Sequence, residues 1–125
     1  MKERLALLRQ ADVISQHAYT GTLEAAQFLS GHLNIDTRNE QFQMAMTHLA
    51  RAIDRITAGE PISNGLDPEL LGEIYQDDAY EQISALNLAT LTFYDIAAVP
   101  EAENSFLISN LFSLFCAGQF EEEAC

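Results

Sequence analysis

The stretch of sequence that decides the fold is Thr47-His48-Leu49-Ala50-Arg51-Ala52-Ile53-Asp54-Arg55-Ile56-Thr57-Ala58-Gly59. Here and just before it, apolar residues recur every three or four positions, at Phe42, Ala45, Met46, Leu49, Ala52, Ile53 and Ile56. That period is typical of a helix that buries one face. Because successive helical residues are about 100° apart, His48, Arg51 and Arg55 fall together on one flank. The stretch therefore predicts a long helix with a histidine and two arginines at the edge of its buried face.

The flank formed by these three residues suggests a phosphoryl-accepting site. Two nearby guanidinium groups favour the neutral, nucleophilic form of an imidazole. They can also pair with phosphoryl oxygens once these arrive. We therefore expect His48 as a phosphoacceptor, with Arg51 and Arg55 stabilising the phosphate. The alternative is structural: His48 lies at the boundary of the core and both arginines pair with acids of a neighbouring helix. On spacing alone the structural alternative is the more common.

The rest of the chain predicts further helices and no strand, since no segment alternates apolar and polar residues. Thr37 followed by Glu40 is a capping-box pattern, which we expect to begin the long helix, and Gly59 and Pro61 end it. Other helices are expected at about residues 2–15 and 22–33, after Asp67-Pro68-Glu69, at 77–94, and from Pro100 onward. The expected fold class is all-α, a compact bundle of five to six helices. We divide it into an N-terminal helix (residues 1–16), a helical domain (17–118) and an acidic C-terminal tail (119–125).

The charge of the chain is unevenly placed, and this bears on its partners. The formal net charge is −13, and all six basic residues lie in the first 55 positions. The 70 residues that follow contain thirteen acids and no Lys or Arg. Such a chain repels a phosphate backbone, so we expect no direct binding to nucleic acid. The acidic surface suits basic protein partners, although it is more often a device for solubility.

Several classes of protein are disfavoured by missing motifs. No apolar run approaches the roughly 20 residues of a membrane span, and Met1-Lys2-Glu3-Arg4 does not begin a signal peptide, so we expect a cytoplasmic protein. Cys116 and Cys125 form no metal motif, and the chain has no phosphate-binding loop or nucleophile motif. We therefore expect no enzyme activity, no metal and no cofactor. His17 is expected at the surface between two helices, and His32 in a structural role near a helix C-terminus.

Three motifs appear in order between about residues 20 and 116. The first, from His48 to Ile56, is followed by Gly59 and Ile62-Ser63-Asn64. The second is a tyrosine-containing turn, Ile74-Tyr75-Gln76-Asp77-Asp78-Ala79-Tyr80. The third is Glu103-Asn104-Ser105-Phe106, with Asn110 four residues further on. In type, order and spacing these motifs resemble the PTS regulation domain (PRD), an all-helical domain of bacterial antiterminators and activators that control sugar operons.

The resemblance implies a regulatory module that the phosphotransferase system phosphorylates reversibly on His48, through the phosphocarrier HPr or an EIIB component. It also implies that phosphorylation shifts a dimer equilibrium. Two positions depart from the family. Asn110 stands where the family has its second histidine, so Glu103 and Asn110 would form a degenerate second site. Arg51 stands where the family more often has an apolar residue. Since no RNA-binding module or helix-turn-helix domain fits beside the helical domain, we expect a stand-alone module that acts through a partner.

The last helix has apolar side chains on more than one side. Leu107, Leu111 and Leu114 form one stripe, and Phe106 and Phe112 lie on other sides. Such a helix either lies at the centre of the bundle or meets another subunit with its second face. Because exposed apolar area usually marks an interface, we expect a homodimer with Phe106 or Phe112 at or near its contact surface. The alternative function, from a different class, is a dimerisation or scaffold module that is never phosphorylated.

Overall fold

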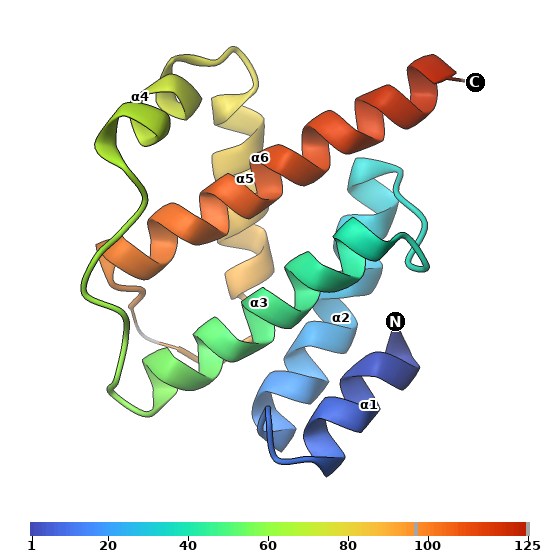
Figure 1. Ribbon diagram of the computed structural model, residues 1–125, viewed down its shortest axis with the longest axis vertical. Coiled ribbons are helices and arrows are strands. Elements are labelled where there is room, and N and C mark those ends of the chain that lie inside the picture. The colour runs from blue at the N-terminus through green and yellow to red at the C-terminus, as the bar shows by residue number, and fades with distance from the viewer. Residues whose placement is uncertain (97, 125) are drawn as a thin grey trace.

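The computed structural model describes residues 1–96 and 98–124, the side chains of residues 119–124 excepted. This part of the chain contains six helices and no strand, which confirms the all-α prediction (Figure 1). The helices are α1 (Lys2–Gln10), α2 (Gln16–Leu33), α3 (Glu40–Thr57), α4 (Pro68–Gln76), α5 (Tyr80–Leu91) and α6 (Glu101–Ala124). No helix among the described residues is long and apolar enough to cross a membrane.

Helices α3 and α6 form the centre of the arrangement. Figure 1 shows them side by side and antiparallel, with α5 behind α6 and with α1 and α2 on the other side of α3. Helix α4 packs against α5 and α6. This arrangement follows from the apolar stripe of α3, because its buried members are Phe42, Ala45, Met46, Leu49, Ala52 and Ile53. Ala50 lies beside that stripe and is also buried, because α3 lies between α2 and α6.

Two helix starts differ from the expectation. The N-cap of α3 is Asn39, whose side-chain oxygen accepts a hydrogen bond from the backbone N–H of Phe42 at 2.9 Å, so the Thr37 capping box is wrong. Thr37 instead precedes Arg38, which donates to the carboxylate of Asp36 from its backbone and its side chain. The helix therefore begins after this local turn, at Glu40, with Asn39 as its cap.

Helix α2 begins six residues earlier than the sequence suggested. Its N-cap is Ser15, whose hydroxyl oxygen accepts from the backbone N–H of Ala18 at 3.0 Å. Ser15 in turn donates from its backbone N–H (2.8 Å) and its hydroxyl to the carboxylate of Asp54 on α3. This contact between distant parts of the chain holds the start of α2 in place. His17 therefore lies in the first turn of α2 and not between two helices.

Helix α6 continues into the stretch that the sequence analysis assigned to a C-terminal tail. Its backbone continues to Ala124, so residues 119–124, which the sequence analysis assigned to an acidic tail, are helical. The acidic side chains of that stretch and Cys125 lie outside the described residues. Helix α5, by contrast, is shorter than expected and runs only from Tyr80 to Leu91.

The packing of α3 predicts which substitutions destabilise the fold. Phe42 is fully buried. We expect Phe42→Ala to lower the free energy of unfolding by about 3–5 kcal/mol, since it removes apolar contacts and leaves a cavity. Leu88→Ala is the control, because Leu88 is 66% exposed on α5. Urea denaturation followed by circular dichroism measures both, and an equal effect of the two would contradict the assignment of the core.

Candidate functional site

The antiparallel pair α3 and α6 forms a surface pocket of about 230 Å³. Its walls are His48, Arg51, Ala52 and Arg55 from α3, and Glu103, Phe106, Leu107 and Asn110 from α6. All five site residues expected from the sequence therefore meet in one pocket. The sequence analysis assigned these residues to two separate sites. It did not identify Ala52 and Leu107 as site residues, because nothing in the sequence distinguishes them from the other apolar residues of the two buried helix faces.

The register of the two helices places the polar residues at opposite ends of this pocket. Arg55 pairs with Glu103 at one end. Seven residues back along α3 and seven residues on along α6 each span about 10 Å, which brings His48 and Asn110 to the other end. Arg51 lies between the two ends on the same flank of α3. Asn110 thus shares a pocket with His48.

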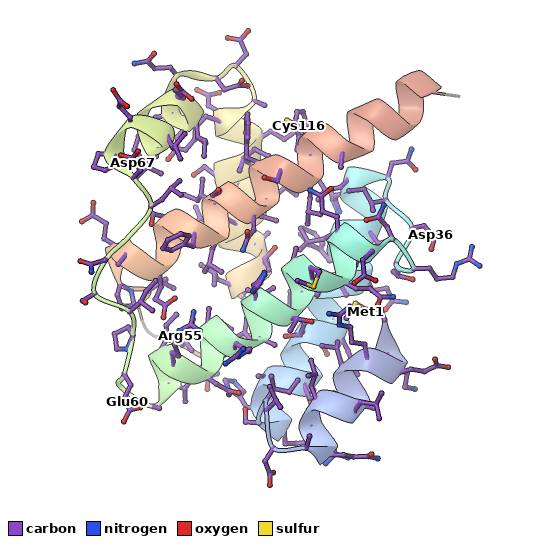
Figure 2. The ribbon with its side chains drawn as sticks, in the orientation of Figure 1. Met1, Asp36, Arg55, Glu60, Asp67 and Cys116 are labelled. Atoms are coloured by element: carbon purple, nitrogen blue, oxygen red, sulfur yellow. The ribbon has the colours of Figure 1, made fainter. Side chains whose placement is uncertain are left out.

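The pair of Arg55 and Glu103 is bidentate. The Nε and Nη2 atoms of Arg55 donate to Oε2 and Oε1 of Glu103, each at 2.9 Å. The Glu103 side chain is only 1% exposed, and the Arg55 side chain is 38% exposed. Figure 2 shows Arg55 between the end of α3 and the start of α6. Parallel hydrogen bonds of this kind combine charge with fixed geometry, so Arg55 is held in one orientation.

The carboxylate of Glu103 has a further partner and a shifted acidity. Its Oε2 atom also accepts from the backbone N–H of Ile62 at 3.2 Å. The hydrogen bonds from Arg55 lower the pKa of the Glu103 carboxyl, and they outweigh the opposing effect of burial. The same pairing raises the pKa of the Arg55 guanidinium. Glu103 is therefore a charged, buried group with a structural task.

Hydrogen-bonding capacity remains in the pocket. A guanidinium has five N–H donors, and Glu103 takes two of those on Arg55. Within the described residues, Arg51 forms no ion pair and the His48 side chain forms no hydrogen bond, and both side chains are exposed. Of the two arginines, Arg55 pairs with an acid of a neighbouring helix, as the structural alternative expects, and Arg51 does not. The pocket can therefore offer an incoming anion donors from both arginines.

The other two histidines lie outside this pocket. The ring of His17 meets the edge of Tyr94, with ring centres 6.3 Å apart. His32 packs on Phe28 with ring centres 4.2 Å apart, and its Nδ1 atom lies 3.0 Å from the Phe28 carbonyl oxygen. Among the described residues, no group of three His, Cys, Asp or Glu side chains could hold a metal ion.

The charge of Glu103 makes a prediction about pH. Because the folded-state pKa of Glu103 is lowered, its ionised form stabilises the fold at pH values above the ordinary pKa of 4.5. That stabilisation is lost as pH falls through the folded-state pKa. We expect Glu103→Gln to lower the free energy of unfolding by about 1.5–3 kcal/mol near pH 7. The decrease should become progressively smaller below pH 4.5. The exposed Glu73→Gln on α4 is the control and should change stability by less than about 0.5 kcal/mol. Urea denaturation at several pH values tests this, and a cost independent of pH would contradict it.

Comparison with known proteins identifies a relative of similar length. No family model and no solved structure matches the chain. The chain is 34% identical over 121 residues to the uncharacterized protein YhfY of Escherichia coli (strain K12). The match covers 97% of this chain and 99% of that protein, so the two are related over nearly their whole lengths. The chain therefore belongs to the family of Escherichia coli YhfY.

Proposed function

We propose that this protein is a regulatory module that the phosphotransferase system phosphorylates reversibly on His48. The observation that carries the proposal is the pocket between α3 and α6, where an exposed histidine lies beside two arginines. Two of the six basic residues of a chain with net charge −13 gather there. Glu103 offsets the charge of Arg55, so Arg51 gives the pocket its net positive charge. Local positive charge on a protein with net charge −13 favours the approach of an anionic group at that point.

With a phosphohistidine donor, the chemistry is the transfer of a phosphoryl group between two histidines. A neutral imidazole nitrogen of His48 attacks the phosphorus of a phosphohistidine on the donor protein. The new N–P bond forms as the donor's N–P bond breaks, and the donor's imidazole leaves with the electron pair of that bond. No net proton is lost, because each ring keeps the proton on its other nitrogen. Since little other covalent work is needed, positioning and charge stabilisation by the arginines supply the catalysis.

The two arginines have different parts in this proposal. Arg55 is held by Glu103, so its remaining donors point into the pocket without needing to be ordered. Arg51 has no described ion pair and can follow the phosphoryl oxygens as they arrive. Asn110, at the end of the pocket near His48, can donate a hydrogen bond but cannot accept a phosphoryl group. The module therefore has one phosphorylation site in this pocket.

The resemblance to the PTS regulation domain supports a role in the control of sugar operons. The donor is then HPr or an EIIB component, and the place of action is the cytoplasm, where those carriers work. The module acts through a protein partner and not by direct contact with nucleic acid, in keeping with the absence of Lys and Arg after position 55.

Phosphorylation is tested directly by labelling. Incubation with phosphoenolpyruvate, enzyme I and HPr should attach acid-labile phosphate, and His48→Ala should abolish the label. Arg51→Ala should slow labelling roughly 10–100-fold, the effect of losing one charge-assisted hydrogen bond worth about 1.5–3 kcal/mol. His17→Ala and His32→Ala are the matched controls and should label normally. Label that survives His48→Ala would overturn the assignment of the site, and no label with either HPr or an EIIB component would favour the scaffold alternative.

A dimerisation module is the second candidate function, and Phe106 favours it. This side chain is 37% exposed at the edge of the His48 pocket. Phe112, the other candidate from the sequence, is half-buried near α4. A contact between two copies at Phe106 would lie beside the phosphorylation site, so that added charge would act on the dimer.

We therefore predict a homodimer with about twice the 13.9 kDa chain mass. Phe106→Glu should lower the mass measured by light scattering towards that of the monomer, because it places a charge in the contact surface. Leu7→Glu is the control, since Leu7 is 66% exposed on the distant helix α1. A wild-type monomer at high micromolar concentration would rule out the dimerisation candidate.

A further inference from the structure

The segment between α3 and α4, residues 58–67, is attached to the start of α6 at two points. The backbone N–H of Ile62 donates to Oε2 of Glu103 at 3.2 Å, and that of Leu66 donates to the hydroxyl oxygen of Ser105 at 2.9 Å. Figure 1 shows the segment passing the first turn of α6, and Figure 2 labels Glu60 and Asp67 near its ends. At the second point the approach is close, because a Cβ on Gly65 would lie 2.8 Å from the Ser105 hydroxyl oxygen.

The first attachment shares an atom with the pocket. Oε2 of Glu103 accepts from Ile62 and from Nε of Arg55, whereas the Ser105 hydroxyl donates to the carbonyl oxygen of Ala102, which does not line the pocket. Arg55, Glu103 and Ile62 thus form a continuous chain of hydrogen bonds from the His48 pocket to the segment. The hydrogen bond between Leu66 and Ser105 is not part of this series of hydrogen bonds.

We propose that a phosphoryl group on His48 competes with Glu103 for Arg55 and thereby releases residues 60–64 from α6. This inference rests on the proposed function, since it names what phosphorylation of that same site changes. The competing group has a charge of about −1.5 to −2 and three acceptor oxygens, which exceeds the single charge of a carboxylate. The Arg55 side chain is 38% exposed, so it has room to reorient within the pocket.

The consequence for Glu103 follows from its burial. A carboxylate that is 1% exposed is strongly destabilised when its counter-charge leaves. It must then take a proton from solvent or turn outward into water. Either change weakens the bond to Ile62, because a charged acceptor binds an N–H roughly twice as strongly as a neutral one, and a carboxylate turned outward is out of reach. The Leu66 attachment remains, so the release ends at Gly65.

Hydrogen–deuterium exchange on the full chain tests this inference independently of any donor protein. Potassium phosphoramidate phosphorylates accessible histidines, so a His17→Gln, His32→Gln background leaves His48 as the single target, with stoichiometry read by mass spectrometry. Phosphorylation should accelerate exchange of the Ile62 amide, the N–H in residues 60–64 that donates to Glu103, about tenfold or more. Exchange at Leu66 should change less than about twofold. Unchanged exchange in residues 60–64 on stoichiometrically phosphorylated protein would overturn the inference.

Three variants separate the coupling from general loosening. Arg55→Gln should accelerate exchange in residues 60–64 without phosphorylation, and phosphorylation should add little to it. Glu103→Gln keeps an acceptor for Ile62 but has no charge to compete, so its response to phosphorylation should shrink. Ser105→Ala should expose the Leu66 amide and leave the response of residues 60–64 intact.

The two proposals fail in different ways. A normal exchange response with chemically phosphorylated protein, but no label from the phosphotransferase proteins, would remove the proposed donor and keep the coupling. Labelling of His48 by those proteins without an exchange response would keep the proposed donor and remove the coupling. Failure of phosphoramidate to modify the exposed His48 would contradict its accessibility and overturn both.

Discussion

The buried carboxylate of Glu103 is the constraint on which the arrangement of α3 and α6 depends. A charge with 1% exposure is tolerated only where a partner neutralises it and hydrogen bonds satisfy its oxygens. Arg55 and the backbone of Ile62 meet both conditions. Because a bidentate pair has little freedom, it sets the register of the two antiparallel helices. That register brings His48 and Asn110 to the other end of the pocket, two helical turns away.

The motif around His48 divides its polar residues between two tasks. Asp54 accepts hydrogen bonds from Ser15 and holds the start of α2 against α3. Arg55 joins α3 to α6. His48 and Arg51 make no such contacts within the described residues and face the pocket. Asp54 and Arg55 therefore both make contacts that stabilise the fold, and Arg55 also lines the pocket with His48 and Arg51. Conservative change at Arg55 would affect both tasks together.

An acidic protein gives such a pocket an unusual electrostatic setting. With net charge −13, most of the surface repels a phosphoryl group or an acidic carrier, and the α3–α6 pocket concentrates two of the six basic side chains. Screening limits such effects to about 10 Å at ordinary ionic strength, so the pocket acts on groups that dock beside it.

The sequence by itself determined the helical class, the buried stripe of α3 and the flank shared by His48, Arg51 and Arg55, because each depends on a period of 3.6 residues within one segment. It failed at Asn39 and Ser15, where a competing turn at Asp36 and a contact with Asp54 select the helix starts. Only the tertiary structure decided that Arg55 pairs with Glu103 and that Asn110 shares the pocket with His48. Arg55 and Glu103 are 48 positions apart in the chain, and His48 and Asn110 are further apart still. No local pattern records which faces of two amphipathic helices will pack together or in which register.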